Sequence, residues 1–578
     1  MKPAYGHVTV SLSISAALLA LTAFAAIGAE PSGSLVGSVD DPSGRPVVGA
    51  NIQARNIATN QTRQTQTTAD GSYWITFLPP GNYDVQVSTA GFETAVSPAI
   101  RVEVNQTFRA NFHLVLGRVE QHIIVSDEVQ PIRSDDSTIG FTVGERSINQ
   151  LPLNERNFVT FSLLVPGAQL PPDGSQNSVY GLTVSVNGAR EQENNFLLDG
   201  TDNNDQSING YSALPSVDAI REFQVQGADS SAEYGRNGGA QINVVLKSGT
   251  NQIHGDAFEF LRNRHMDAKN FFDLPACHSG PPSAACGSIP RLDRSQFGGT
   301  LGGPIVKDKT FFFVSAEGLI LHQAVTRTAT VPSMAERADA LNTIPAALQN
   351  PAGLAVLNLY PAANIGSDLA TSTEYLAQPV QHETSYQPLI KIDQQISLRD
   401  TLAFHYSLSD SSTFYPYDPF YAFTNLPGYG TNYPDRGQNT GLSWIHIFNP
   451  HTVNELRPGY NRFSGGITQQ DAGQNFSAPL GFPSLAQAPI DQGYPDVVLA
   501  GFDGIGDPVN APQHRSDNTI QLADTLAWNP TFWGGRHQIK VGFDLRDIRL
   551  NFFLDPIARG EWQFTGAFTQ NPLEDLLL

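Results

Sequence analysis

The stretch IKVGFDLR, residues 539 to 546, decides the fold class. Every second side chain in it is apolar, and successive side chains of a strand point to opposite faces, so this period of two predicts a strand with one apolar and one polar face. The apolar residues are Ile539, Val541, Phe543 and Leu545, and the polar ones are Lys540, Asp544 and Arg546. In a transmembrane barrel such strands turn the apolar face to lipid and the polar face to the lumen.

The same period appears upstream in two segments that a short link joins. Leu402, Phe404, Tyr406 and Leu408 alternate with Ala403, His405, Ser407 and Ser409, while Ile390, Ile392 and Ile396 alternate with Lys391, Asp393 and Gln395. The link 397–400 is short enough for a tight turn, so these segments predict a hairpin with a periplasmic-type turn.

Segments of this kind continue from about residue 252 onward and predict about ten barrel strands. Further candidates are 257–262, 296–302, 310–316, 442–448, 453–463, 520–528 and 562–568. Trp444, Tyr460 and Trp528 suit the aromatic girdles at the membrane interfaces. The long irregular stretches 331–383 and 464–518 are expected to be outward loops that capture a ligand. After the first 30 residues, no segment reaches the roughly 18 apolar residues of a membrane-spanning helix, so entry into a membrane requires a closed barrel.

Residues 138–250 predict a compact α+β unit. A buried strand at 196–198 ends at a turn, a second strand at 219–225 follows a short helical turn, and 241–246 alternates Ile242, Val244 and Leu246 with polar or small neighbours. These strands predict a mixed sheet small enough to fit inside a large barrel.

Three ordered motifs in this unit resemble the plug of TonB-dependent receptors. They are LPLNERNFVTFSLLVPG (151–167), VSVNGAREQENNFLLDGTDNND (184–205) and DAIREFQVQGADSSAEYGRNGGAQINVVLKSGTN (218–251), and RSQFGGTLGGPIVKDKTFFFVSAEG (294–318) is similar to the first barrel hairpins of the Oar-like subfamily. The resemblance implies a plug inside a barrel of about 22 strands. The plug-motif residues are Asn187, Arg190, Asp199, Gly200, Gly235, Gly238 and Gly239.

Two other interpretations of these motifs are weaker. Asp199, Asp202 and Asp205 recur every three residues, but they lack the D-x-D-x-D-G spacing and terminal Glu of a calcium loop, so a solvated turn with local hydrogen bonds is favoured. The glycines from 235 to 239 match no phosphate-loop pattern and are expected to permit turns and close backbone approach.

Residues 30–117 predict a β-sandwich, because strand-length runs alternate with turns such as Ala69-Asp70-Gly71. The order of these runs resembles the carboxypeptidase regulatory-like domain, a prealbumin-like sandwich. Tyr73, Trp74 and Tyr83 are expected in its core, and stacking on a sugar is the alternative for them. The chain contains neither H-x-x-E nor H-E-x-x-H, so zinc peptidase chemistry is not expected.

Residues 118–137 predict a linker that carries an apolar β-former. His122, Ile123, Ile124, Val125 and Ser126 resemble a Ton box in position and character, and such a segment binds by adding a strand to a partner's sheet. The alternative is that these residues form the last strand of the sandwich.

Residues 1–29 have the basic start, apolar run and small-residue end of a secretory signal peptide. Export would expose Cys277 and Cys286 to an oxidising compartment, so we expect one loop-closing disulfide between them; a metal pair with His278 is the weaker alternative.

Charge and motif content exclude several functions. The chain has 34 basic and 55 acidic side chains, a net charge of −21, which repels nucleic acid. No catalytic constellation or cofactor motif appears, so neither an enzyme nor a cofactor is expected.

These expectations divide the chain into a signal peptide (1–29), a sandwich (30–117), a linker (118–137), a plug (138–250) and a partial barrel (251–578), the barrel being C-terminally truncated. The expected protein is a TonB-dependent receptor and transporter of the outer membrane, with its N-terminal domains in the periplasm and barrel lumen. TonB, outer-membrane lipid and an extracellular ligand, such as a glycan, a peptide or a metal chelate, are the expected partners. The alternative is a secreted or surface carbohydrate-binding or adhesion protein.

Overall fold

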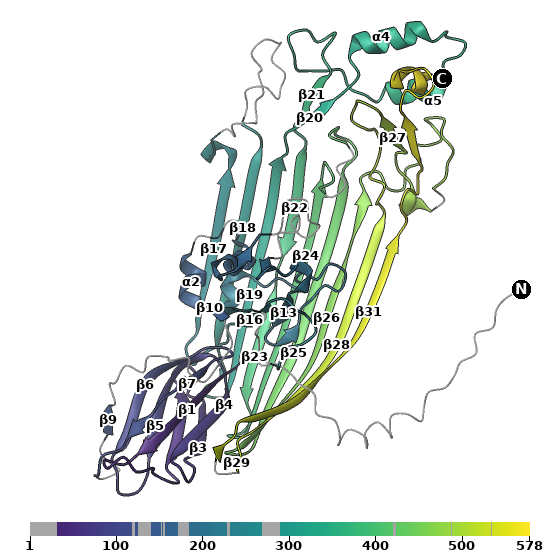
Figure 1. Cartoon of the computed structure of the whole chain (residues 1–578). Helices are drawn as coiled ribbons and strands as arrows, with labels where there is room; N and C mark the ends of the chain where they lie inside the picture. The colour runs from purple at the N-terminus through teal and green to yellow at the C-terminus, as the bar shows by residue number, and fades with distance from the viewer. Residues whose placement is uncertain are drawn as a thin grey trace, which may run out of the picture.

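The computed structural model describes residues 32–117, 122–124, 140–151, 153, 156–170, 184–227, 232–268, 289–419, 424–486, 488–532 and 535–578. Strands dominate these residues and form an N-terminal sandwich, a small mixed sheet and a curved antiparallel sheet of ten strands (Figure 1). The predicted fold class, mainly β, is confirmed. No helix of the described part is both long and apolar enough to cross a membrane.

The N-terminal sandwich packs two sheets around one apolar core. One sheet holds β4 (Ser72–Leu78), β1 (Gly33–Asp40), β7 (Thr107–Arg109) and β8 (Phe112–His113), and the other holds β3 (Thr62–Gln66), β2 (Asn51–Asn56), β5 (Gly81–Ser88), β6 (Thr94–Val102) and β9 (His122–Ile124). Tyr73 and Tyr83 are 1% and 3% exposed, and the Tyr73 hydroxyl donates to the Ala110 carbonyl over 2.7 Å. Their predicted core role is therefore confirmed, while Trp74 is half-buried.

The plug, residues 140–246, is a five-stranded mixed sheet with short helical turns. Its order is β10 (Gly140–Gly144), β15 (Ile220–Gln226), β16 (Gln241–Leu246), β13 (Asn195–Leu198) and β14 (Thr201–Asp202). Around it lie α2 (Glu145–Gln150), the 3-10 turns η2 (Phe158–Leu164), η3 (Glu191–Glu193) and η4 (Val217–Ala219), and the β11 (Ala168–Gln169) and β12 (Ser185–Val186) pair. All six residues of β16 are buried, so both faces of this predicted alternating strand are covered.

The barrel sheet is antiparallel, and each strand pairs mainly with its sequence neighbours, because the connections are hairpins. Its strands are β17 (His254–Asn263), β18 (Leu292–Val306), β19 (Thr310–Ala324), β22 (Val380–Tyr386), β23 (Leu389–Gln395), β24 (Asp400–Tyr415), β25 (Thr431–Asn449), β26 (Thr452–Gln469), β28 (Gln513–Trp528) and β31 (Ile539–Leu554). The β23–β24 hairpin pairs as predicted. Figure 1 shows the plug against the concave face of the sheet and the sandwich at one end.

The two faces of the barrel sheet differ as the period of two predicts. On β31, Leu545 is 61% exposed, while its neighbour Arg546 reaches the plug. On β24, Phe404 is 38% exposed, while His405 is 4% exposed. The convex face is therefore apolar and open, and the concave face carries polar groups that contact the plug.

An outer cap lies at the end of the sheet opposite the sandwich (Figure 1). It has its own apolar core and comprises β20 (Arg327–Thr330), α4 (Met334–Thr343), α5 (Pro351–Leu357), β21 (Glu374–Ala377), η6 (Pro489–Asp491), β27 (Asp496–Leu499), β32 (Glu561–Phe564) and α6 (Pro572–Leu577). The stretches 331–383 and 464–518 were expected to be irregular, which is wrong for 331–383 where α4, α5 and β21 lie, whereas most of 464–518 is irregular apart from η6, β27 and the ends of β26 and β28. The predicted barrel strand at 562–568 is also wrong, because β32 pairs in parallel with β27 in the cap.

Candidate functional site at the plug–barrel interface

The turn that follows β13 is polar and almost fully buried. Asp199 and Gly200 both have positive φ, 45° and 74°, which reverses the chain from β13 into β14. The residues that follow are at most 1% exposed: Thr201, Asp202, Asn203, Asn204 and Asp205. The turn therefore presses carboxylates and amides against the barrel wall.

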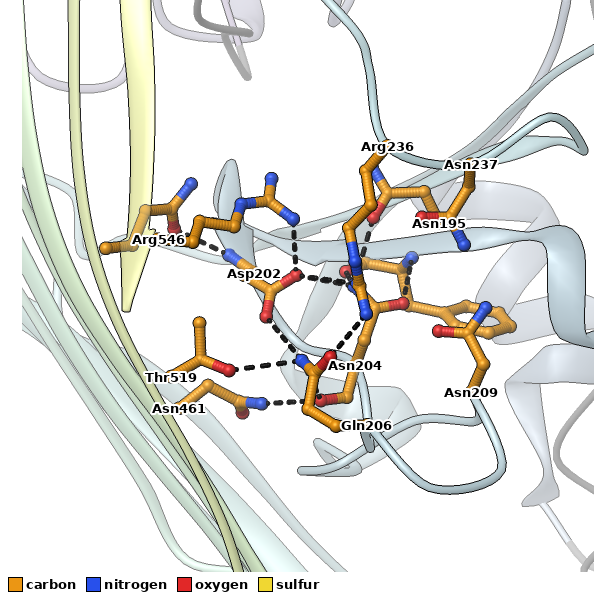
Figure 2. Close-up of polar contacts among 12 residues, drawn as sticks. Asn195, Asp202, Asn204, Gln206, Asn209, Arg236, Asn237, Asn461, Thr519 and Arg546 are labelled. Carbon is orange, nitrogen blue, oxygen red and sulfur yellow. Dashed lines mark hydrogen bonds and ion pairs between the residues drawn. The ribbon is translucent and has the colours of Figure 1, made fainter. Parts of the chain in front are cut away.

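Asp202 lies between two arginines from different parts of the chain. Its Oδ1 accepts from Arg546 Nη1 of the barrel over 2.8 Å and lies 3.4 Å from Arg236 Nη1 of the plug (Figure 2). The Asp202 N–H donates to Gln521 Oε1 over 2.9 Å. Burial lowers the pKa of Arg236, and Asp202 opposes that shift. The two arginines thus compensate the charge of the Asp202 carboxylate and replace the water that it loses on burial.

The other two aspartates of the motif also pair with barrel cations. Asp205 Oδ2 lies 2.7 Å from Arg515 Nη2, and Asp199 Oδ2 lies 2.7 Å from Lys391 Nζ. The predicted solvated turn is therefore wrong, because all three carboxylates form ion pairs with barrel cations and those of Asp202 and Asp205 are fully buried. The described residues contain no group of three or more His, Cys, Asp or Glu that could hold a metal ion.

Barrel side chains also bind the backbone of this turn. Asn439 Nδ2 donates to the Asp202 carbonyl over 2.7 Å, and Asn461 Nδ2 donates to the Asn204 carbonyl over 2.9 Å. Gln206 Nε2 donates to Thr519 Oγ1 over 3.1 Å, as Figure 2 shows. Because backbone groups away from water need partners, these amides let an irregular turn lie inside the barrel.

Glycines on the barrel wall make room for the plug. A Cβ at Gly437 would lie 1.7 Å from the Ser212 carbonyl oxygen, and one at Gly441 would lie 2.3 Å from Thr201 Oγ1. Contacts this short leave no space for a side chain, so the plug backbone approaches the wall at these points.

The remaining predicted plug-motif residues lie at turns around this interface. Asn187 has a φ of 53°, and Arg190 is an exposed residue that precedes η3. A Cβ at Gly239 would lie 2.7 Å from the Glu193 carbonyl oxygen, which is a close approach, whereas Gly235 and Gly238 have nothing within 4 Å. The structure gives no steric reason for those two glycines.

Two cations that the sequence reasoning missed complete the interface. Arg236, which has a φ of 73° beside the glycines, reaches Asp202. Arg156 lies 2.6 Å from Asp218 Oδ2 and 3.4 Å from Glu317 Oε1 of the barrel. Burial raises the pKa of Asp218, and Arg156 opposes that shift. Only the presence of Arg in the motif GRNGG could have suggested the first.

The candidate Ton box and disulfide lie partly or wholly outside the described residues. His122, Ile123 and Ile124 form β9, which pairs in parallel with β6 as the alternative of a last sandwich strand predicts, while Val125 and Ser126 are not described. The signal peptide, Cys277 and Cys286 are also outside the described residues.

Comparison with known proteins places this architecture among outer-membrane barrels. The carboxypeptidase regulatory-like domain matches residues 34–115. The TonB-dependent transporter Oar of Myxococcus xanthus is 28% identical over 307 residues, which are 51% of this chain and 28% of Oar. The predicted resemblance to Oar-like proteins is thus confirmed.

Two solved structures resemble the chain, the outer membrane transporter YddB from Escherichia coli and the siderophore receptor PirA from Acinetobacter baumannii. Each has a TM-score of 0.43 and 13% sequence identity, and the match covers 71% of this chain and 48% of the other. The chain spans less than a third of the length of Oar and about half the length of these two proteins.

The family model of the outer membrane beta barrel domain matches residues 245–578, more than half of the chain. This match confirms the predicted outer-membrane location. The chain belongs to the outer membrane beta-barrel domain family.

Proposed function

We propose that this protein is a TonB-dependent receptor and transporter, which binds an extracellular ligand and admits it to the periplasm when the plug rearranges. The observation that carries the proposal is the chemistry of the plug–barrel interface. Ion pairs and amide hydrogen bonds join the two parts at Asp199, Asp202 and Asp205. Water can replace such contacts one by one, so a polar interface supports a plug that detaches and returns.

The proposed point of pull is the segment from His122 to Ser126. The pairing of β9 with β6 supports the proposal, because it shows that this segment can add as a strand to a sheet, which is how an extended segment binds a partner. TonB binding would require this segment to leave β6. The five-part division of the chain and a Cys277–Cys286 disulfide remain part of the proposal.

The ligand is proposed to enter at the outer cap, because the cap lies at the end of the barrel opposite the sandwich (Figure 1). A glycan, a peptide and a metal chelate remain the candidate classes of ligand. PirA, one of the similar structures, is described as a siderophore receptor. The secreted carbohydrate-binding alternative loses support at two of its three candidate residues, because Tyr73 and Tyr83 are in the sandwich core and are unable to stack on a sugar, while Trp74 is half-buried.

A reporter cysteine under the plug tests the proposal without knowledge of the ligand. Thr519 is 1% exposed and faces Gln206 of the plug, so T519C, in a chain carrying C277S and C286S, is shielded while the plug is seated. We expect a small hydrophilic maleimide to label T519C in energised cells and not in cells that lack TonB or receive a protonophore. S397C, in an exposed turn, is the control and should be labelled under every condition. Equal labelling of T519C with and without TonB would refute the proposal.

A further inference from the structure

The N-terminal sandwich is docked on the barrel. Arg63 Nη2 donates to Thr401 Oγ1 over 2.9 Å, and Asn60 Nδ2 donates to Asp308 Oδ1 over the same distance. Asp308 lies in the turn between β18 and β19, and Thr401 is the second residue of β24, next to the β23–β24 turn. The Asn251 N–H also donates to the Ala58 carbonyl over 3.0 Å.

An aromatic side chain from the sandwich packs against the concave face of the barrel sheet. Phe77, at the end of β4, is 1% exposed and packs with Ile445, Val453 and Ala527 on the concave face of the barrel sheet. Its φ is 58°, which is strained for a bulky side chain and persists only where surrounding contacts fix it. The strain and the burial together make Phe77 a wedge that ties the sandwich to the barrel.

The sandwich is bonded to the plug as well. The Val104 N–H donates to Glu222 Oε2 and the Val104 carbonyl accepts from Gln224 Nε2, both over 3.0 Å. Asn105 Nδ2 donates to Gln224 Oε1 over 2.7 Å. These bonds join the sandwich to β15 of the plug, beneath the interface described above.

The three parts together line a partly open cavity of about 100 Å³. Ser32, Phe77, Pro79 and Pro80 of the sandwich line it on one side, and the rest of the lining comes from the plug and the barrel, including Asp199 and Lys391. The sandwich therefore closes this part of the lumen below the Asp199–Lys391 pair. Movement of the plug alone would leave that closure in place.

We propose that the sandwich is a second gate, which closes the periplasmic mouth below the plug and has to undock, withdrawing Phe77, before a ligand passes. This inference rests on the proposed transport function. The gate opens only when the contacts at Thr401, Asp308 and Asn251 break. The segment from His122 to Ser126 lies between the sandwich and the plug in the chain, so a pull there acts on the sandwich as well as on the plug.

A second reporter distinguishes the gate from the plug. Ala527 is 1% exposed beneath Phe77, so A527C, again with C277S and C286S, reports undocking of the sandwich. We expect maleimide labelling of A527C in energised cells containing TonB, and loss of that labelling without TonB. F77A, combined with A527C, should raise labelling several-fold in cells without TonB, because the wedge is gone.

A disulfide lock provides the matched control. The backbone bond between Asn251 and Ala58 brings those positions within disulfide reach, so A58C/N251C should hold the sandwich on the barrel. Q53C/Q64C joins two facing positions inside the sandwich and leaves it free to move. After the lock has been oxidised, maleimide labelling of A527C in energised cells containing TonB should be lost with the first lock and kept with the second.

The outcomes separate the two proposals. Labelling of T519C with no labelling of A527C, or labelling of A527C despite the A58C/N251C lock, would overturn the second gate and leave transport standing. Absence of TonB-dependent labelling at both reporters would overturn the proposed function and the gate with it.

Discussion

Arg546 on β31 donates to Asp202 in the plug over 2.8 Å, although the two residues are 344 positions apart in the chain. Asp202 is completely buried, and the side chain of Arg546 is 13% exposed. Removing one partner of a buried pair leaves the other charge without compensation, which costs more than the pair contributes. This ion pair therefore couples the seating of the plug to the position of the β31 wall.

R546M should loosen the plug. Arg236 remains 3.4 Å from Asp202 and still compensates part of its charge. We therefore expect the free energy that keeps the plug seated to fall by about 3 kcal/mol, the low end for an unpaired buried charge. Hydrogen exchange of the backbone amides in 195–205 measures it in the extracted protein. R549M is the matched control, because Arg549 on the same strand pairs with Asp547 at the exposed surface; solvent screens this pair, so the variant should leave the exchange of these amides close to that of the parent protein. Equal effects of the two variants would contradict a coupling role for Arg546.

G437A should displace the plug from the wall. The added methyl would fall 1.7 Å from the Ser212 carbonyl oxygen, so the two backbones have to separate, at a cost of about 1–3 kcal/mol. Faster proteolysis of the plug in the folded protein is the expected result. G235A adds the same methyl where nothing lies within 4 Å and should leave proteolysis unchanged. Unaltered proteolysis in G437A would show that the plug is not seated on this glycine.

The outer cap should become less stable as pH rises. Asp496 is 3% exposed, and burial raises the pKa of its carboxyl from 3.8 to about 8. Glu561 and Asp507 raise it further, while Arg559 opposes the shift. Between these two pKa values the folded cap keeps a proton that the unfolded chain releases. The contribution of Asp496 to the stability of the cap is therefore complete below pH 4 and falls as the pH rises to about 8, by up to about 1.4 kcal/mol per pH unit.

D496N tests whether the cap loses stability as the pH rises, because an amide does not titrate in this pH range. Proteolysis of the 489–507 segment should accelerate from pH 5 to pH 8.5 in the parent protein and much less in D496N. E374Q changes an exposed carboxylate of the same cap and should keep the parental slope. A parent protein whose cap becomes more resistant at higher pH would contradict the burial of Asp496 as the cause.

The period of two was sufficient to predict most of the barrel. It placed residues such as Leu545 and Arg546 on opposite faces, because side-chain alternation is a local property of a strand. It failed at 562–568, where an apolar run of strand length pairs in parallel within the cap. Periodicity does not say which strand a segment pairs with.

The candidate site was predicted less well, for a physical reason. The motif identified Asp199, Asp202 and Asp205, but the cations that bury them are Lys391, Arg546 and Arg515, between 192 and 344 residues away. The sequence around such an aspartate is that of a solvated polar loop. Only the fold brings the distant cation to the carboxylate.

The most direct test of the central claim is whether TonB contacts the segment from His122 to Ser126 in cells. A photoreactive phenylalanine analogue in place of Ile124, in the protein in its native outer membrane, should yield a covalent adduct with TonB on irradiation, and the adduct should diminish when a protonophore is added. A proline at the same position, I124P, should abolish TonB-dependent labelling of T519C, because proline has no N–H to donate to an added strand. Absence of any TonB adduct, together with unchanged labelling of T519C in I124P, would contradict the account.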